Sequence, residues 1–158
     1  MPDKALISIE KASPKDDGKL KKIGMTCYQI NIDPEHRYWV VRWLFRRYFS
    51  KKRFAARRKN GVLIYCLKKD GMIAGFYELE KNGLLSSLYV MPAFQKEGFG
   101  KLLLKDAMQK AKDLGMKEMR LDASEFARDF YLQRGFEKNG DSRTVLGVTM
   151  IPLKIKIS

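Results

Sequence analysis

Three consecutive strand-like segments joined by very short turns constrain the fold of this chain most strongly. They span residues 62–69, 72–80 and 84–90, and their connections are Asp70-Gly71 and Lys81-Asn82-Gly83. Asp-Gly between two such segments is a strong hairpin signal, and connections this short join antiparallel neighbours. The three segments therefore predict an antiparallel meander.

Helices and further strands are predicted on both sides of this meander. Before it, the sequence predicts a strand over residues 5–10 and a helix that starts at Ser13-Pro14 and is weakened by Gly18 and Gly24. A long helix is predicted from Asp33-Pro34-Glu35 to Asn60-Gly61. After it come a helix over 100–115, a strand over 118–123, a helix over 126–135, and two strands around 136–146 and 147–157, the last with Pro152 indicating a sheet edge. This order predicts a single α/β (α+β) domain over residues 1–158, with a helix crossing over between strands four and five.

The charge of the chain is concentrated in one segment. The sequence holds 32 Lys and Arg against 18 Asp and Glu, a net charge of +14 at pH 7. Between Arg37 and Lys69 there are twelve basic residues and no acidic one. A positive segment of this kind points to an acidic partner or ligand.

Composition excludes several classes of protein. The N-terminus MPDKALISIEK lacks the apolar run of a signal peptide, and no stretch approaches the ~18 apolar residues that a membrane span needs. Cys27 and Cys66 are too few for a disulfide scaffold, and the single His36 leaves no His-rich metal cluster. We therefore expect a cytoplasmic protein with no transmembrane segment and no metal.

The stretch YVMPAFQKEGFGK, residues 89–101, carries the most specific chemistry. A strand ends at Met91-Pro92, and a short loop with Gly98 and Gly100 opens directly into a helix. The free N–H groups of a first helical turn and the helix dipole favour an anion, and glycine allows the backbone to approach it closely. From these features alone two interpretations stay open: a phosphate-binding loop, or glycines that serve only a tight turn.

Gln95-x-x-Gly98-x-Gly100 resembles the pyrophosphate-binding loop of the GNAT superfamily of acetyl-CoA-dependent N-acetyltransferases. LYVMPAFQKEGFGKLLLKDAM looks like that family's strand four, coenzyme loop and third helix, and LDASEFARDFYLQRGF looks like its strand five and fourth helix. The dinucleotide fingerprint does not fit because its third glycine is missing, and no Gly-Lys-Ser/Thr follows as in a Walker loop. With the 72–80 strand, the resemblance covers roughly half of the chain.

The resemblance implies a GNAT fold, a mixed and mostly antiparallel sheet of about six or seven strands with about four helices, splayed between strands four and five. It implies acetyl-CoA as co-substrate, with no metal, and an oxyanion-binding N–H near Val90. The residues that match the family's coenzyme contacts are Leu88, Tyr89, Val90, Gln95, Lys96, Glu97, Gly98, Phe99, Gly100, Lys101, Ser124, Ala127 and Tyr131.

Tyr131 matches the family's general acid, which protonates the leaving thiolate. A phenol is a neutral donor at pH 7 and suits that role. The alternative is a core tyrosine, because Ala127 and Tyr131 lie four residues apart on one helix face. Ser124 has a second role open to it, as the N-cap of the same helix.

The general base is less well defined. Many relatives place a Glu near the start of strand four, where this chain has Leu84-Leu85-Ser86-Ser87. Glu78 and Glu80, at the end of strand three, are the nearest candidates, acting through water, and the alternative is that both are solvated carboxylates at a strand edge. His36 is a further candidate.

The basic segment 37–59 interleaves Arg and Lys with aromatic residues at helical spacing. It predicts either a helix that packs its aromatics and solvates its charges, or a surface for nucleic acid or an anionic membrane. Its sign disfavours polyamines and aminoglycosides as acceptors and favours an amine on an acidic partner, such as a protein or an aminoacyl-tRNA. The sequence thus predicts direct acetyl transfer to a primary amine, with a homodimer as a further expectation. The alternative is a nucleic-acid- or ribosome-associated binding module on a GNAT scaffold.

Overall fold

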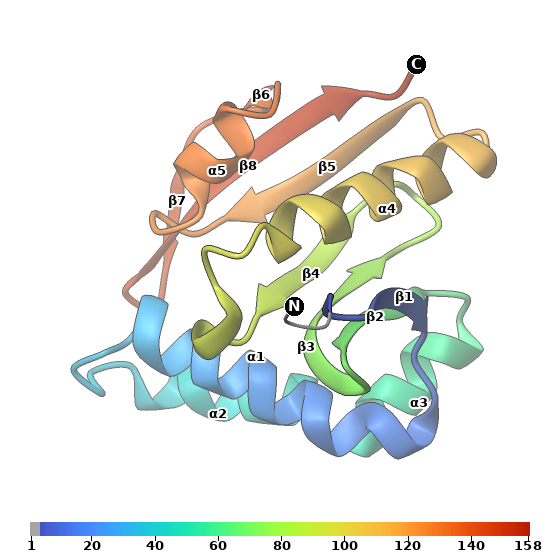
Figure 1. The fold of residues 1–158 in the computed structure, drawn as a ribbon. Coiled ribbons are helices and arrows are strands. Elements are labelled where there is room, and N and C mark those ends of the chain that lie inside the picture. Colours follow the sequence, from blue (N-terminus) through green and yellow to red (C-terminus); the bar gives the residue numbers. More distant parts are fainter. Residues whose placement is uncertain (1–3) are drawn as a thin grey trace.

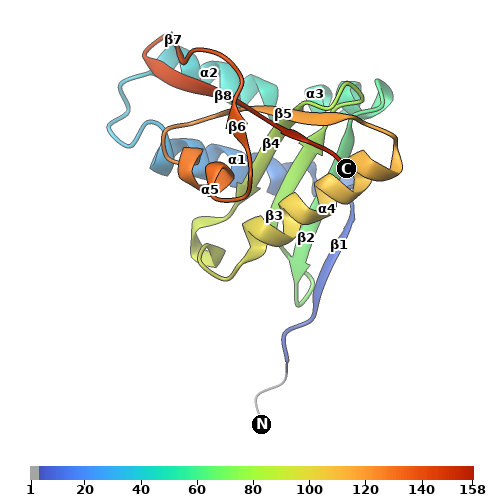
Figure 2. The ribbon, with the colours of Figure 1, turned by 90° about the horizontal axis from the view of Figure 1, so that it is seen from above.

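A computed structural model describes residues 4–158 (Figures 1 and 2). Its strands are β1 (Ile7–Lys11), β2 (Leu63–Lys69), β3 (Met72–Leu79), β4 (Leu85–Val90), β5 (Glu118–Ala123), β6 (Glu137–Lys138), β7 (Arg143–Val145) and β8 (Val148–Lys156). Its helices are α1 (Asp17–Asn31), α2 (Trp39–Tyr48), α3 (Lys51–Lys59), α4 (Phe99–Asp113) and α5 (Arg128–Leu132), with short 3-10 turns η1 (Pro14–Asp16) and η2 (Pro92–Phe94). Residues 1–3, which the sequence analysis counts within its single domain, lie outside the described residues.

The strands form two sheets that meet at one point. The first has the order β1-β2-β3-β4 and is antiparallel throughout, which confirms the predicted meander. The second has the order β5-β8-β6, with β7 also paired to β8. A single parallel bridge between Leu84 and Arg120 links β4 to β5. Beyond that bridge the two strands diverge, so the predicted splay between strands four and five is confirmed (Figure 1).

Helices cover both faces of the first sheet (Figures 1 and 2). On one face, α4 packs Leu103, Leu104 and Ala107 into a core shared with both sheets. On the other face, α1 and the α2–α3 corner build a second core around Phe49 and Phe54. This two-sided burial explains why β3 is apolar along almost its whole length instead of alternating.

The single long helix predicted from Asp33 to Asn60 is wrong, because the structure has two shorter helices. Asp33 is buried, and its carboxylate accepts the backbone N–H groups of Arg37 at 2.7 Å and Tyr38 at 3.0 Å. These bonds close a loop in which His36 takes the left-handed conformation with φ 57°, and α2 starts only at Trp39. Ser50 then separates the helices, since its extended backbone breaks α2 and its hydroxyl accepts the first-turn N–H of α3.

The predicted edge position of Pro152 is also wrong. β8 is the central strand of its sheet, with β5 on one side and β6 and β7 on the other. The Pro152 carbonyl accepts the Asn139 N–H at 2.9 Å, and in an antiparallel strand the N–H of a residue points to the same side as its carbonyl. The backbone nitrogen of Pro152, which carries no hydrogen, therefore faces the space between β6 and β7. The hydrogen bonds between β5 and β8 are unaffected.

Gly24 has a packing role inside α1, where the sequence analysis treats it only as a weakness. A Cβ at this position would lie 2.6 Å from the ring of Phe49. The missing side chain lets α1 approach the α2–α3 corner closely, which offsets the low helix propensity of glycine.

Candidate active site

The end of β4 borders the gap between the two sheets. The Met91 N–H donates to the Ala74 carbonyl on β3 at 2.8 Å. Because successive residues of a strand direct their N–H groups to opposite sides, those of Leu88 and Val90 point away from β3 and toward β5. The Val90 carbonyl accepts bonds from the Gln95 amide at 3.1 Å and the Cys27 thiol at 3.2 Å.

The loop after β4 forms an open cradle at the start of α4. Gly98 has φ 83°, a left-handed conformation that favours glycine, and a Cβ there would meet nothing within 4 Å. Gly98 is the N-cap of α4, and no side chain caps this helix end. A Cβ at Gly100 would lie 3.3 Å from the ring of Phe130 on α5. The free first-turn N–H groups and the open surface are suited to a phosphate.

Two residues that the sequence assigns to coenzyme contact hold the loop in place. The Glu97 carboxylate pairs with the Lys69 ammonium at 2.7 Å. The same ammonium lies 5.6 Å from the ring centre of Phe94 and 5.9 Å from that of Phe99. These contacts tie the loop to the end of β2, so Glu97 and Phe99 have structural roles beside any contact with a ligand.

A basic hollow of about 520 Å³ runs along α4 beside the loop. Its positively charged lining residues are Lys101, Lys105, Lys112, Arg134 and Lys156. We call it the α4 hollow. The sequence analysis did not assign Arg134, although this residue directly precedes the Gly-Phe pair of the family motif.

Tyr131 lies on α5, at the end of β5 that borders the gap (Figure 1). Its ring makes edge contacts with Phe130 at 5.0 Å and Phe136 at 5.3 Å between centroids. Burial raises its pKa above the usual range of a phenol, so the hydroxyl is neutral at pH 7. The nearby Ser124 hydroxyl accepts the Ala127 N–H at 3.2 Å and stabilises the turn before α5.

A second tyrosine, Tyr89, lies on β4. The pKa of Tyr89 on β4 is raised by burial first and then by Tyr48, Cys27 and Tyr131. The Tyr89 ring packs at 5.8 Å from Phe49, on the face covered by α1. Tyr89 therefore packs against the core on the α1 face, whereas Tyr131 belongs to the core shared with α4.

The structure separates the two carboxylates that the sequence groups as base candidates. Glu78 is fully buried and accepts bonds from Arg57 at 2.7 Å, Tyr48 at 3.2 Å and Ser87 at 2.5 Å. Glu80 is half-buried and lies past the end of β3, in the turn to β4. The alternative of a solvated strand-edge carboxylate therefore does not describe Glu78.

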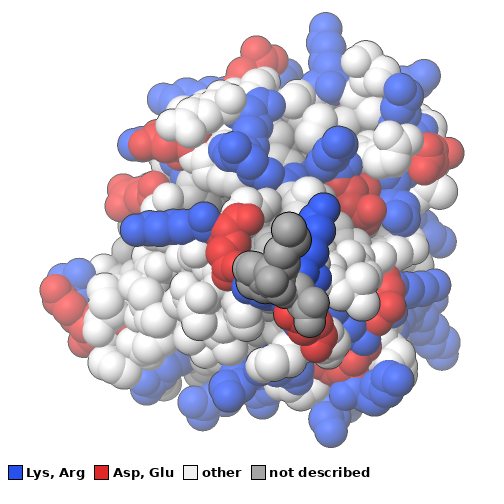
Figure 3. Space-filling view, in the orientation of Figure 1, with Lys and Arg blue, Asp and Glu red and all other residues white. Residues whose placement is uncertain are grey.

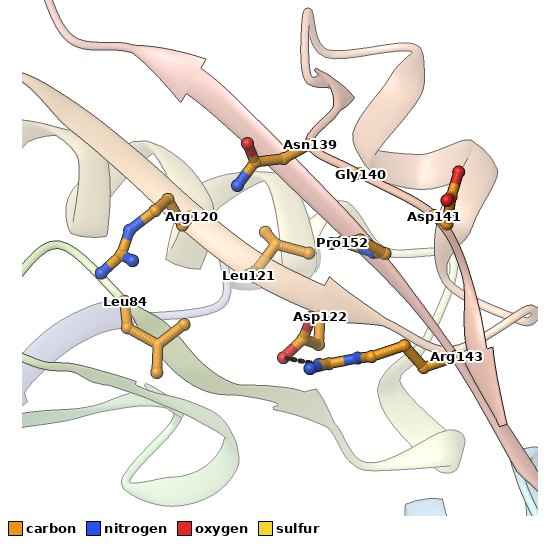
Figure 4. A pocket seen from close by; sticks show the side chains of 9 residues that line it. All are labelled: Leu84, Arg120, Leu121, Asp122, Asn139, Gly140, Asp141, Arg143 and Pro152. Carbon is orange, nitrogen blue, oxygen red and sulfur yellow. Dashed lines mark ion pairs between the residues drawn. The ribbon is translucent and has the colours of Figure 1, made fainter. Parts of the chain in front are cut away.

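A second hollow, of about 370 Å³, lies on the face of β5 opposite α4 (Figure 4). Leu84 lines it from the segment before β4, Arg120 and Asp122 line it from β5, and Arg143 from β7 pairs with Asp122 at 3.1 Å. We call it the β5 hollow. Arg120 and Asp122 are not among the site residues expected from the sequence, although their alternation with the buried Met119, Leu121 and Ala123 marks them as one face of a strand.

The basic segment 37–59 combines packed and exposed aromatics. Phe49 and Phe54 are buried, whereas Trp39 and Trp43 are 69% and 54% exposed. Basic side chains also follow the lower edge of the molecule in Figure 3, behind which α2 and α3 run in Figure 1. The segment therefore anchors the helices and also presents indole rings among basic groups.

The structure adds two observations on membrane spans and metals. No helix within residues 4–158 has the length and apolar character that a membrane span requires. In the same part of the chain, no three His, Cys, Asp or Glu side chains are grouped so that they could hold a metal ion.

Comparisons with known proteins agree with this arrangement. Over 101 residues the chain is 31% identical to an uncharacterized N-acetyltransferase in the pepI 3' region of Lactobacillus delbrueckii subsp. lactis. That match covers 55% of this chain and 58% of the relative, so the chain spans less than two thirds of the relative's length.

Two solved structures share the fold. One is the PaiA N-acetyltransferase of Thermoplasma acidophilum in complex with coenzyme A, with a TM-score of 0.82, 22% identity, and coverage of 96% of this chain and 99% of that one. Another is the ribosomal-protein-S18-alanine N-acetyltransferase of Escherichia coli, with a TM-score of 0.72, 19% identity, and coverage of 97% and 95%.

A family model described as the acetyltransferase (GNAT) domain matches residues 33–157, which is most of the chain. The matched region contains β4, the open cradle before α4, and Tyr131. The chain therefore belongs to the GNAT acetyltransferase family.

Proposed function

We propose that this protein transfers the acetyl group of acetyl-CoA directly to a primary amine. The observation that carries the proposal is the diverging pair β4 and β5, with an uncapped helix N-terminus at one side and a neutral buried phenol at the other. Direct transfer is favoured because Cys27 and Cys66 are both buried and burial raises their pKa to about 12 and about 11. Neither thiol is an activated nucleophile.

In this proposal the loop and the α4 hollow bind the phosphate groups of the coenzyme. The first-turn N–H groups of α4 face the pyrophosphate, with Gly98 allowing close approach, while Gly100 lets α4 pack close to Phe130 on α5. Lys101 and Lys105 come from the first two turns of α4, and Arg134 faces them across the hollow. Such a concentration of positive charge suits a polyanionic ligand.

The reaction needs an oxyanion donor and a proton donor. The N–H groups of Leu88 and Val90 face the gap, where they pair with the pantetheine arm, and the Val90 N–H stabilises the oxyanion that forms on the thioester carbonyl. Tyr131 then donates its proton to the leaving thiolate. A buried phenol with a raised pKa keeps this proton available across the neutral range.

Glu78 and Glu80 are the carboxylates that the sequence offers as base candidates, beside His36. Arg57 already balances the charge of Glu78, and two hydroxyl groups occupy its lone pairs. Glu80 is more accessible and lies at the turn between β3 and β4. The geometry therefore favours Glu80 over Glu78 for proton transfer through water, and assigns Glu78 to holding the α2–α3 corner on the sheet.

Coenzyme binding tests this proposal through Gly98→Val. The branched side chain strains a backbone with φ 83° and fills the open cradle, so we expect the Kd for coenzyme A to rise at least about a hundredfold. The matched control is Gly115→Val, because Gly115 has φ 74°, equally open surroundings, and a place at the far end of α4. Isothermal titration calorimetry measures both, and equal affinity for the two variants would contradict the loop assignment.

The exposed tryptophans favour a second candidate function, the binding of RNA at α2 and α3. Trp39 and Trp43 are four residues apart on one helix face, and the Arg47 guanidinium lies 5.6 Å from the ring centre of Trp43. Exposed aromatic rings stack on unpaired bases while Arg and Lys contact phosphates.

A homodimer and a cytoplasmic location, both expected from the sequence, stay predictions.

Tryptophan fluorescence tests this second candidate directly, because the chain has only these two tryptophans. We expect single-stranded RNA to quench their emission, with an affinity that falls steeply as salt rises. Trp39→Phe with Trp43→Phe should weaken binding about tenfold or more in a filter assay, from the loss of base stacking. No quenching at physiological salt would remove RNA as the partner, and quenching by anionic vesicles instead would assign the surface to membranes.

A further inference from the structure

The β5 hollow carries charges of both signs on the face of β5 opposite α4. Two guanidinium groups, of Arg120 and Arg143, and two carboxylates, of Asp122 and Asp141, line it (Figure 4). Its volume of about 370 Å³ is in the range of sites for small molecules. A hollow with this lining suits a small ligand that itself carries both charges.

The hollow lies at the point where the two sheets begin to separate. Leu84 and Arg120, the two residues of the parallel bridge, both line it. Asp122 is the next residue of β5 on the same face, beyond the bridge, where β5 has left β4. A group bound at Asp122 therefore approaches the gap from the side opposite α4, while the phosphate cradle lies at the α4 end.

The ion pair in the hollow is weak enough for a ligand to replace. The side chain of Asp122 is 32% exposed and that of Arg143 is 59% exposed, so solvent screens their attraction. An ammonium group that binds Asp122 and a carboxylate that binds Arg143 would separate the pair and leave no charge without a partner. A bare amine would leave the Arg143 guanidinium without a counter-ion.

Arg120 is held in a fixed position beside this pair. Its Nη2 donates to the Asn82 carbonyl at 3.1 Å, and its Nε lies 3.9 Å from the Glu118 carboxylate. The remaining N–H groups of the guanidinium add a second donor set for an anion. The hollow thus offers one carboxylate next to β4 and two guanidinium groups around it.

We propose that the β5 hollow binds the amine substrate, and that this substrate is a small zwitterion of the amino-acid type. Asp122 binds its ammonium group, and Arg143 with Arg120 binds its carboxylate. This inference rests on the proposed acetyl transfer, and for a substrate bound in the hollow it gives the role of general base to Asp122 in place of Glu80.

The proton balance is complete with these groups. Asp122 takes one proton from the ammonium group, and the freed nitrogen lone pair forms a bond to the thioester carbonyl carbon. Asp122 passes this first proton to solvent and then takes the second proton of the nitrogen, which it also passes to solvent, and the C–S bond breaks as the carbonyl re-forms. The thiolate takes the proton of Tyr131, which recovers one from solvent, so the net products are the amide, free coenzyme A thiol and one proton.

A matched substrate panel tests the proposal. Each of the common α-amino acids is assayed beside its own α-amide, with release of coenzyme A thiol as the readout. The amide keeps the amine and the side chain and loses only the anionic charge. We expect the best amino acid to exceed its amide about tenfold or more in kcat/KM, although the amine of the amide is the less basic and more easily deprotonated one.

Two variants, with two controls, distinguish the role of Arg143 in binding the carboxylate from the role of Asp122 in proton transfer. Arg143→Gln should raise KM for the amino acid about tenfold and leave kcat and the reaction of the amide nearly unchanged. Asp122→Asn should lower kcat about a hundredfold for both the amino acid and its amide, because the carboxylate that accepts the proton of the ammonium group is lost. The controls are Lys68→Gln and Glu10→Gln, which remove an ion pair between β1 and β2, remote from the hollow. They should change neither kcat nor KM.

Every outcome bears on the proposal. Amides that match or exceed their amino acids in the wild type, or an Asp122→Asn variant with normal kcat, would overturn it. Acetylation of components of a cell extract with no turnover of any amino acid would also overturn it, while leaving the proposed acetyl transfer intact. If the protein shows no acetyl transfer at all, calorimetry measures whether amino acids bind to it. Binding to the wild type that is lost in Asp122→Asn and Arg143→Gln supports the β5 hollow as an amino-acid site. No binding of any amino acid to the wild type refutes it.

Discussion

Replacing Tyr131 by phenylalanine is expected to lower kcat about a hundredfold or more while leaving the Kd for acetyl-CoA nearly unchanged. The change removes one hydroxyl group from a buried ring that packs against Phe130 and Phe136, so the fold keeps its apolar contacts. General acid catalysis contributes typically about 10²–10⁴ in rate, and the thiolate would have to leave unprotonated in the variant. Steady-state kinetics and calorimetry with coenzyme A measure the two quantities separately.

Tyr65→Phe is the matched control for this prediction. Tyr65 lies on β2 and stacks on Tyr77 with ring centres 5.6 Å apart, away from the gap between the sheets. It should retain full activity. Because burial raises the pKa of Tyr131, the wild-type rate should show no loss of this acid below the usual phenol range near pH 10. A Tyr131→Phe variant with normal kcat would remove the phenol from the mechanism.

Removing the carboxylate of Glu78 is expected to have the largest effect on stability. Glu78→Leu leaves the Arg57 guanidinium, whose side chain is only 14% exposed, without its partner. Breaking a buried ion pair from one side costs about 3–5 kcal/mol of unfolding free energy. The measurement is urea unfolding of the wild type and the variant.

A double variant distinguishes the charge effect from a packing effect. Arg57→Met together with Glu78→Leu replaces the pair by apolar groups and should recover a large part of the loss, because no buried charge is left alone. Recovery stays incomplete, since Arg57 also donates to the Tyr48 carbonyl at 2.8 Å and stacks over its ring. Glu80→Gln should cost less than about 1 kcal/mol, as at other partly exposed positions. Equal losses for Glu78→Leu and the double variant would contradict the ion-pair explanation.

The fold could be predicted in large part because its signals are local. Asp70-Gly71 and Lys81-Asn82-Gly83 define two hairpins by themselves, and both occur where expected. The late start of α2 at Trp39 could not be predicted, because Asp33-Pro34-Glu35 is typical of a helix N-terminus. The loop that replaces this first turn depends on the buried Asp33, whose carboxylate accepts the N–H groups of Arg37 and Tyr38, and such a contact has no periodic signal in the sequence.

The candidate site also has one part that the sequence predicts and one part that only the folded chain shows. The cradle at Gly98 and the phenol at Tyr131 lie in contiguous motifs, and the sequence locates both. The residues of the β5 hollow come from four separate segments, and only the folded chain brings Arg143 to Asp122. The partners of Glu78 are equally distant in sequence, so its burial was not predictable from its position at the end of a strand.

The central claim, acetyl transfer to an amine, is tested most directly with isotopically labelled acetyl-CoA and a whole-cell extract. Wild type and Tyr131→Phe are run side by side, and the products are separated into small-molecule, protein and RNA fractions. We predict label in the small-molecule fraction that depends on Tyr131 and is stable to mild base, as an amide is. No Tyr131-dependent label in any fraction, from a protein that still binds coenzyme A, would contradict the claim and favour a binding module on the same fold.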